Sequence, residues 1–187
     1  PFNSIYLLGN ERCRRVMSVF GWSKSFGIAG MRIGCIYTTD PALFERMVER
    51  SDVMSTAGGI SSLSQIAGTA CMHNYDWVDA FLVHLKGNRD YAVDRLKHMP
   101  LVKAYAPRAT YLLYVDIRAF GMKSEDFTDY MKQKVKLALV SGGEKFFGQG
   151  SEGYIRICFA TSRGILEEGL NRLEQGIRML MEEKGLH

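Results

Sequence analysis

The sequence has few of the features that build disulfide frameworks, metal sites or membrane spans. Its four cysteines, Cys13, Cys35, Cys71 and Cys158, lie far apart and form no C-x-x-C pair. They argue against a disulfide framework or a zinc site and favour reduced, mostly buried thiols in a cytoplasmic protein. No apolar run is long enough to cross a membrane, and no stretch has the pattern of a signal peptide. The sequence thus predicts neither a metal centre nor a membrane anchor.

An excess of charge of one sign is also absent. The 187 residues include 24 lysines and arginines against 20 aspartates and glutamates, a formal net charge of +4 with the signs interspersed. So mild a balance predicts neither nucleic acid nor a membrane surface as a partner. Hydrophobic residues make up 47% and charged residues 24%, which is typical of a globular protein with a substantial core.

Residues 16–37, VMSVFGWSKSFGIAGMRIGCIY, carry the clearest chemistry. They predict two short apolar strands, Val16–Phe20 and Cys35–Tyr37, joined by a polar, glycine-rich turn of about a dozen residues. In that turn Lys24 is flanked by two serines, and Arg32 follows eight residues later. Glycine lets the backbone come close to a ligand, and a lysine and an arginine can reach the same anion. The turn is therefore a candidate anion site.

This turn has two other interpretations, a nucleotide-binding loop and a plain surface turn. The chain contains no G-x-x-x-x-G-K-[ST] and no G-x-G-x-x-G followed by a helix, so nucleotide loops of the P-loop and Rossmann types are excluded. A lone Ser-Lys-Ser is common in solvated turns, and a plain surface turn stays open as the alternative.

A second glycine cluster, GGEKFFGQGSEG at 142–153, leads into a predicted strand, Tyr154–Ala160. That strand is apolar except for Arg156, and a charge within an apolar strand is costly unless it meets an anion. Arg156 is therefore a candidate anion-binding residue. An edge-strand arginine that reaches solvent is the alternative, and Arg118 and Arg163 are weaker candidates for the same role.

Hydrophobic periodicity and turn signals place the remaining elements. Asp40 before Pro41 starts a helix in the expected way, a capping aspartate followed by proline in the first turn. Further helices are expected at 61–73, at 75–99, from Ser124, and at the C-terminus, where one apolar stripe contains Leu166, Leu170, Leu173, Ile177 and Leu180. Strands are expected at Val102–Ala106, Tyr111–Ile117 and Leu137–Val140. The long helix before Pro100 predicts a connector between two domains, with the boundary near residue 95.

The pattern S-K-x-F-x-x-x-G-x-R-x-G resembles the pyridoxal-phosphate lysine segment of the class I/II (fold type I) aminotransferases and their relatives, which include C–S β-lyases. The pattern F-G-x-G-x-x-G-Y-I-R-I, followed by A-T-S, resembles the same family's substrate-binding segment. The resemblance implies pyridoxal 5'-phosphate (PLP) as cofactor and Lys24 as the catalytic Schiff-base lysine. It places Arg32 on the cofactor phosphate, Ser23 against the phosphate or the Schiff base, and Arg156 on the α-carboxylate of the substrate.

The fold that the resemblance implies is α/β, the PLP-dependent transferase fold type I. Residues 1–95 would be the C-terminal portion of the large PLP-binding domain with its connecting helix, and 96–187 the small C-terminal α/β domain. The resemblance covers nearly all of this chain but only about the C-terminal half of a family member. The family's upstream aspartate on the pyridine nitrogen has no counterpart, because the first aspartate is Asp40. Since the chain begins with Pro1, we expect that residues precede it or were removed.

Two details of the resemblance are position-specific. Gly21 stands where some family members have a hydroxyl residue, so one phosphate contact is absent. In the loop Ser55–Ser64, Ser55 or Thr56 would approach the cofactor of the partner subunit, or the segment is a plain solvent loop.

The resemblance implies an aminotransferase that moves an amino group between an L-amino acid and a 2-oxo acid. A PLP-dependent C–S β-lyase of the cystathionine type is the first alternative, and a noncatalytic PLP-binding regulator the second, although no helix-turn-helix is visible. The family also implies a cytoplasmic homodimer. We expect the 187 residues alone to be inactive and to expose unpaired strand edges.

Overall fold

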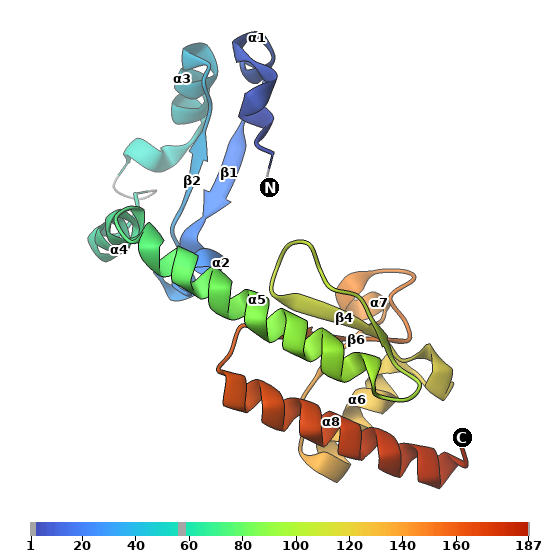
Figure 1. Cartoon of the computed structure of the whole chain (residues 1–187). Coiled ribbons are helices and arrows are strands. Elements are labelled where there is room, and N and C mark those ends of the chain that lie inside the picture. The colour runs from blue at the N-terminus through green and yellow to red at the C-terminus, as the bar shows by residue number, and fades with distance from the viewer. Residues whose placement is uncertain (1–2, 56–58, 187) are drawn as a thin grey trace. The chain divides into compact units, whose positions relative to one another are not determined.

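The computed structural model describes residues 3–55 and 59–186, and its elements are labelled in Figure 1. The chain divides into two compact units, Pro1–Ala80 and Phe81–His187, each of which mixes helices and strands. They are described separately below.

The division lies earlier than the boundary that the sequence predicted near residue 95. The reason is the packing of helix α5 (Tyr75–Lys97), whose buried residues Leu85, Ala92, Val93 and Leu96 all belong to the core of the second unit. The periodicity of this helix is continuous across the division, so sequence alone does not reveal where its packing partners change. The roles of the two parts as cofactor domain and small domain stay a prediction.

The first unit is built from short elements. In chain order they are η1 (Ile5–Leu8), α1 (Asn10–Cys13), β1 (Ser18–Gly21), α2 (Trp22–Ser25), η2 (Ala29–Met31), β2 (Gly34–Tyr37), α3 (Pro41–Arg50), η3 (Asp52–Met54), α4 (Ser62–Met72) and the start of α5. Strands β1 and β2 pair antiparallel from Ser18↔Tyr37 to Gly21↔Gly34. The two predicted strands are thus confirmed with shifted ends, whereas η1 and α1 were not predicted.

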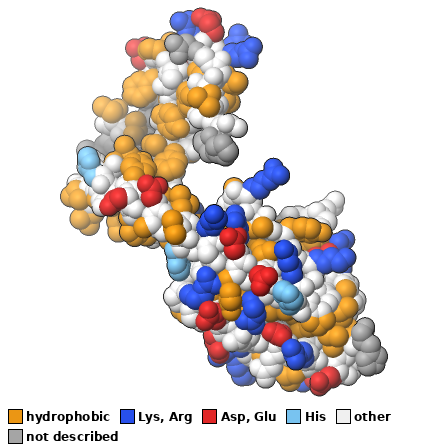
Figure 2. Space-filling model, in the orientation of Figure 1, with side chains coloured by type: hydrophobic (Ala, Val, Ile, Leu, Met, Phe, Trp, Pro, Cys, Tyr) orange, Lys and Arg blue, Asp and Glu red, His pale blue; other side chains and the backbone are white. Residues whose placement is uncertain are grey.

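Hydrophobic side chains remain exposed over much of the first unit, as the orange atoms of Figure 2 show. Val19 is 79% exposed and Ile36 is 56% exposed, although both lie on the paired strands. Among the described residues of this unit, the buried hydrophobic side chains are Cys13, Trp22 and Cys71. The two-stranded sheet therefore lacks a covered face in this structure.

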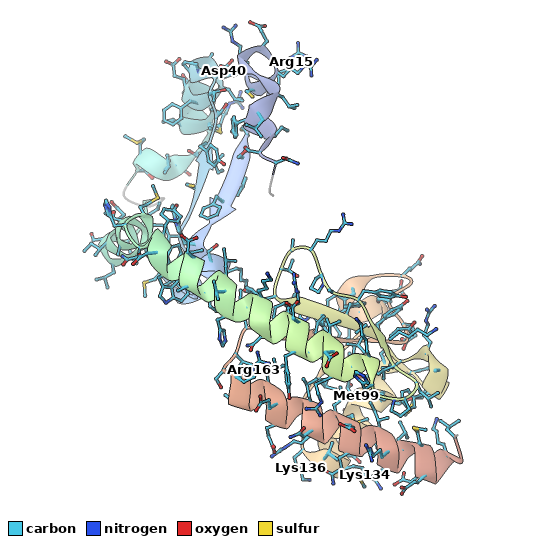
Figure 3. All side chains as sticks on the ribbon, in the orientation of Figure 1. Arg15, Asp40, Met99, Lys134, Lys136 and Arg163 are labelled. Atoms are coloured by element: carbon cyan, nitrogen blue, oxygen red, sulfur yellow. The ribbon has the colours of Figure 1, made fainter. Side chains whose placement is uncertain are left out.

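Helix α3 confirms the capping signal in the sequence. The side chain of Asp40, labelled in Figure 3, accepts a hydrogen bond of 2.8 Å from the backbone N–H of Leu43, and Pro41 occupies the first turn. The carboxylate satisfies a backbone donor that no helical carbonyl reaches.

The second unit is a four-stranded antiparallel sheet of order β3-β4-β6-β5 with helices packed on it. After α5 its elements are β3 (Lys103–Ala104), β4 (Leu112–Asp116), η4 (Arg118–Phe120), α6 (Ser124–Val135), β5 (Val140–Ser141), α7 (Glu144–Phe147), β6 (Tyr154–Cys158) and α8 (Arg163–Lys184). The helix α7 inside the glycine cluster was not predicted. Strand β5 begins at the last residue of the segment predicted for it, because its ladder with β6 starts only at Val140↔Arg156.

One continuous core lies between this sheet and its helices. Residues alternate along the strands, so that Val115 of β4 and Ile155 of β6 are fully buried. Phe127 on α6 is also fully buried. The predicted stripe of the last helix is confirmed, since all of its members are buried, namely Leu166, Leu170, Leu173, Ile177 and Leu180.

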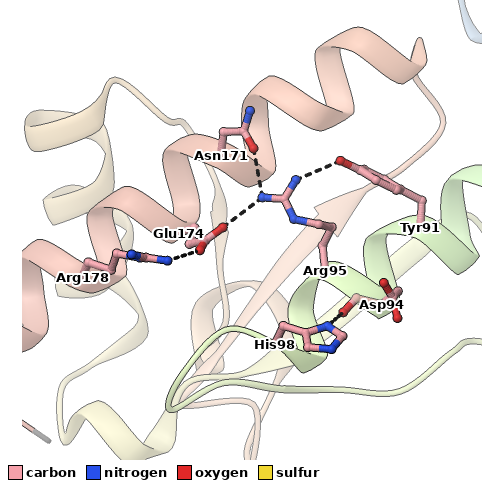
Figure 4. A network of polar contacts seen from close by, with 7 residues as sticks. All are labelled: Tyr91, Asp94, Arg95, His98, Asn171, Glu174 and Arg178. Atoms are coloured by element: carbon pink, nitrogen blue, oxygen red, sulfur yellow. Dashed lines mark hydrogen bonds and ion pairs between the residues drawn. The ribbon is translucent and has the colours of Figure 1, made fainter.

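Helices α5 and α8 are also joined by a polar network, drawn in Figure 4. Arg95 donates to Tyr91 Oη at 2.8 Å, to Asn171 Oδ1 at 2.9 Å and to Glu174 Oε2 at 3.0 Å. Glu174 also accepts from Arg178 at 2.6 Å. The hydrogen bond from Arg178, and after it the one from Arg95, lowers the pKa of Glu174 below its usual value.

The four cysteines are unpaired, but their burial differs from the prediction. Cys13 and Cys71 are buried, whereas Cys35 is half-buried and Cys158 is exposed. Over the described ranges 3–55 and 59–186, no helix is long and apolar enough to cross a membrane, and no cluster of metal-ligating side chains occurs.

Candidate functional site

Lys24 and Arg32 lie on the connection between β1 and β2. The ends of this connection are joined by the ladder pair Gly21↔Gly34, and a Cβ at Gly34 would lie 2.9 Å from the carbonyl oxygen of Phe20. Glycine is therefore required there, because the two strands approach too closely for a side chain. The connection therefore starts and ends at two glycines that face each other across the ladder.

Lys24 sits on α2 with its side chain exposed, and Ser23 beside it is half-buried. The helix is anchored by Trp22, which is buried and packs edge-on against Phe20 with ring centroids 5.5 Å apart. At the other end Phe26 stacks on Trp77, with centroids 5.6 Å apart. Aromatic packing on both sides thus fixes the backbone that carries the lysine, while the amine itself stays accessible.

Arg32 adopts the left-handed conformation, with φ 50° and ψ 42°. Few residues other than glycine do so, and the conformation persists only where its neighbours hold it. Here the carbonyl of Met31 accepts a 2.6 Å hydrogen bond from Ser64 Oγ. Ile33 lies against Gly68, where a Cβ would meet its Cδ1 at 2.8 Å. Both contacts come from α4, so α4 determines the local backbone at Arg32.

The donor set of this connection suits a group that carries an aldehyde and a phosphate. Lys24 offers an amine and Arg32 a guanidinium, and both side chains are exposed. Within the described ranges, neither pairs with an acidic side chain, and the Ser23 hydroxyl makes no hydrogen bond. An amine and a guanidinium left without counter-charges match such a ligand.

Arg156 lies in the second unit, at the centre of strand β6. It pairs with Tyr114 of β4 on one side and with Val140 of β5 on the other. Because Ile155 and Ile157 point into the core, Arg156 points to the opposite face of the sheet, where its side chain is half-buried. Its guanidinium carbon lies 5.4 Å from the ring centroid of Phe147.

Of the two weaker arginine candidates, Arg118 has an acidic partner and Arg163 has an aromatic one. Arg118 grips Asp116 through two hydrogen bonds of 3.0 and 2.7 Å, and this grip lowers the pKa of the aspartate. Arg163 lies over the ring of Tyr91, 4.4 Å from its centroid. Arg156 differs from Arg118, since no acidic side chain in the described part of the chain pairs with it. Its charge is available for a ligand.

The glycine cluster before β6 is pinned to the start of α6. Ser124 N–H donates to Glu152 Oε1, and Ser124 Oγ accepts from Gly153 N–H at 2.8 Å and Tyr154 N–H at 3.2 Å. The first of these bonds chiefly holds the pKa of Glu152 below its usual value. The loop that precedes Arg156 is therefore fixed by hydrogen bonds rather than by a hydrophobic core.

The structure places the remaining candidates as follows. Lys24, Ser23 and Arg32 share one connection in the first unit, whereas Arg156 belongs to the second unit. Ser55 directly follows η3, and its hydroxyl donates to the carbonyl of Asp52 at 2.8 Å. Thr56 lies outside the described residues. A role for this loop at a partner subunit stays a prediction.

Known proteins resemble nearly the whole chain. The model of a family described as aminotransferase class I and II matches residues 2–173. The chain belongs to this family. Its mixed α/β architecture and the fold type I expected from the sequence are thereby confirmed.

Individual aminotransferase-family proteins show how far the similarity extends. The aspartate aminotransferase of Pyrococcus horikoshii is 30% identical over 159 residues, which is 83% of this chain and 39% of that protein. The cystathionine beta-lyase PatB of Bacillus subtilis is 29% identical over 163 residues, 83% of this chain and 40% of that protein. The chain therefore spans about two fifths of the length of the curated relatives it matches.

A solved structure agrees with the sequence comparison. A PLP-bound protein from Clostridium difficile, provisionally an aminotransferase, superposes with a TM-score of 0.78 at 31% identity, covering 89% of this chain and 43% of that one. The aminotransferase family and its PLP-bound member point to pyridoxal 5'-phosphate as the cofactor.

Sequence reasoning missed the aromatic residues around Arg156. Phe147 is the first residue of the second motif, which predicts no role for its ring, and the pattern of Tyr111–Ile117 predicts only that Tyr114 lies on a strand. The alternation of β4 could have indicated that Tyr114 shares a sheet face with Arg156, but only once the register of the two strands was known.

Proposed function

We propose that this chain supplies the attachment lysine, the phosphate arginine and the carboxylate arginine of a PLP-dependent aminotransferase that acts on an L-amino acid and a 2-oxo acid. The observation that supports it most is the family match over residues 2–173 combined with an unpaired amine and an unpaired guanidinium on one pinned connection. Bound PLP would supply the electron sink that stabilises negative charge at the substrate Cα.

The residues of this chain would then act as follows. Lys24 would hold the cofactor through its amine and would serve as the base that takes the proton from the substrate Cα. Arg32 binds the cofactor phosphate, with Ser23 beside it. Arg156 binds the substrate α-carboxylate through two parallel hydrogen bonds, which orients the Cα–H bond.

The attachment lysine is tested by reductive trapping. PLP followed by borohydride is expected to label the peptide that contains Lys24, in this chain or in any longer protein that carries it. The Lys24→Ala variant should lose the label, whereas Lys86→Ala, which removes another exposed lysine, should keep it. A label on another peptide, or none at all, would refute the role of Lys24.

The phosphate arginine is tested by affinity. Arg32→Gln is expected to weaken PLP binding by about 10- to 100-fold, because a hydrogen bond to a charged group is worth about 1.5–3 kcal/mol. Equilibrium dialysis with PLP and with pyridoxal, which lacks the phosphate, separates this effect from a folding defect. Equal losses for both ligands would contradict a phosphate contact.

A C–S β-lyase is the second candidate, favoured by the similarity to cystathionine beta-lyase PatB. The two reactions are separated by assaying amino transfer that depends on a 2-oxo acid against pyruvate release from cystathionine. A noncatalytic PLP-binding regulator would show the trapped label with neither activity.

The assembly and location of the working protein are part of this proposal. We infer that the protein with a complete active site is a cytoplasmic homodimer, and that the 187 residues alone are inactive. Sedimentation of the active protein checks the first point, since an active monomer would contradict it. Activity measured on the 187-residue chain checks the second.

A further inference from the structure

The open face of the second sheet carries a row of aromatic rings with a guanidinium at each end. Phe147 meets Tyr114 edge-on with centroids 5.5 Å apart, and Tyr114 stacks on Tyr154 at 5.3 Å. Arg156 lies over Phe147 at 5.4 Å, and Arg118 lies over Tyr154 at 5.2 Å. The two arginines therefore share one kind of aromatic contact and can be compared directly.

The two guanidinium groups differ in what occupies their N–H edges. Arg118 uses its edge to bind both oxygens of Asp116. Arg156 lies over the ring of Phe147, and no acidic side chain in the described part of the chain pairs with it. A ring on one side of a guanidinium leaves N–H groups on its other sides available, so the contact orders the side chain while donors remain for a carboxylate.

Phe147 itself is held in place by its loop. Its backbone N–H donates to the carbonyl of Gly143 at 3.1 Å, and Gly143 N–H in turn donates to Ser151. Ser151 Oγ donates to the carbonyl of Gly148 at 2.7 Å, which closes the loop immediately after Phe147. The ring is 38% exposed, so its position depends on these bonds more than on burial.

We propose that Phe147 is a positioning residue, whose ring holds the Arg156 guanidinium in place before the carboxylate of the substrate binds. The inference rests on the role proposed above for Arg156. Ordering a flexible arginine before the ligand arrives removes that entropic cost from binding. Loss of the ring should therefore weaken carboxylate binding while the charge of Arg156 stays in place.

The test uses the 187-residue chain with ¹⁵N-labelled arginine, followed by NMR at Nε–Hε, with pyruvate as the carboxylate probe. Arg156→Gln assigns the signal. In the unsubstituted chain the Hε of Arg156 should be shifted upfield by the ring, and Phe147→Met should abolish the shift and weaken pyruvate binding about three- to tenfold. Phe147→Tyr, which keeps the ring, should retain both.

Phe146→Met is the matched control. Phe146 is the adjacent phenylalanine, and its ring lies 5.3 Å from the amine of Lys145 and 6.5 Å from the ring centroid of Phe147. The cation–ring contact of Arg156 is with Phe147. Its replacement should leave the Arg156 signal and pyruvate binding unchanged. Far-ultraviolet circular dichroism of each variant separates a folding defect from a local effect, and Phe147→Tyr keeps the test decisive if Phe147→Met unfolds the loop.

The outcomes distinguish the positioning role of Phe147 from the carboxylate-binding role of Arg156 on which it rests. If Arg156→Gln leaves pyruvate binding unchanged, or the unsubstituted chain does not bind pyruvate, the carboxylate role of Arg156 fails and the inference falls with it. If Arg156→Gln abolishes binding but Phe147→Met does not weaken it, only the positioning role is overturned. In an active protein that carries this chain, Phe147→Met should raise KM more than it lowers kcat.

Discussion

The two units of this chain carry their candidate residues on very different amounts of packing. Every residue of the hydrophobic core cluster lies at or beyond Leu85, in the second unit. Among the described residues of the first unit, buried hydrophobic side chains are confined to Cys13, Trp22 and Cys71. Arg156 therefore lies in a sheet that is packed against a hydrophobic core, whereas Lys24 and Arg32 lie on the connection of a two-stranded sheet.

This contrast separates local geometry from stability. The connection around Lys24 is held by the ring packing of Trp22 and by two contacts from α4 next to Arg32, the hydrogen bond from Ser64 to Met31 and the packing of Gly68 on Ile33. Yet a two-stranded sheet is at best marginally stable in water, and Val19 on it is 79% exposed. The geometry of a site can thus be encoded in a segment that does not have the core needed to hold it.

The largest expected effect is a separation of the two units in urea. Both tryptophans, Trp22 and Trp77, lie in the first unit, so their fluorescence follows that unit alone. We expect the fluorescence transition of the full chain to precede the main transition in circular dichroism, because the first unit buries far less apolar surface. Coincident transitions would show that the two units unfold together and would remove the contrast.

The next effect is a core truncation in each unit. Phe127→Ala should cost about 3–5 kcal/mol, since the ring is fully buried and leaves a cavity. The matched truncation Val19→Ala, at an exposed strand position, should change stability by less than about 0.5 kcal/mol. The free energy of unfolding in urea is measured for Phe127→Ala by circular dichroism and for Val19→Ala by tryptophan fluorescence. A large cost at Val19 would mean that its strand face is covered in solution.

A smaller effect compares one glycine from each glycine-rich loop. A Cβ at Gly142 would overlap the carbonyl oxygen of Ser151 and lie 2.6 Å from that of Tyr154, so Gly142→Ala must displace backbone. We expect a loss of about 1–3 kcal/mol, the usual cost of overpacking. Gly30→Ala meets nothing within 4 Å and should be close to neutral. Thermal unfolding of both variants measures the two losses of stability. Equal losses would show that the two loops are packed with similar tightness.

The parts of the fold that depend on local signals could be predicted from the sequence. The cap at Asp40 and the stripe of the last helix are local patterns, and both are confirmed. The short helices α1 and α7 were missed, because four residues carry too little periodicity to distinguish a helical turn from a loop. The compact units divide at Ala80, whereas the sequence places a domain boundary near residue 95, because the compact division depends on which residues pack against α5 rather than on the helix itself.

The candidate site also has features that local sequence predicts and features that depend on tertiary packing. Lys24 and Arg32 are eight residues apart, so their place on one connection between two strands could be predicted from the sequence. The contact of Phe147 with Arg156 could not, because it requires the closure of the loop at Ser151 and the pairing of Tyr114 with Arg156. Neither the distance between a ring and a guanidinium nor the register of two strands is visible in a linear motif.

The smallest expected effect concerns acid. All the ion pairs formed by the described residues lie in the second unit, and Glu174 joins Arg95 and Arg178 in the network of Figure 4. Because its pKa is lowered by folding, Glu174 stabilises the folded state above the pKa of about 4.3 expected in the unfolded chain. That contribution is lost as pH falls through the lower folded value.

Glu174→Gln should therefore reduce stability by up to about 1 kcal/mol at pH 7, and the difference should vanish once the pH is below the folded pKa of Glu174. Glu168→Gln, which breaks a single exposed pair with Arg172 on the same helix, is the control and should have a smaller effect. Circular dichroism melts at several pH values measure both. Since Glu174 belongs to the second unit, the tryptophan transition of the first unit should stay where it is. If that transition moves with Glu174→Gln, the two units are coupled, and the Lys24 segment draws stability from the unit that carries Arg156.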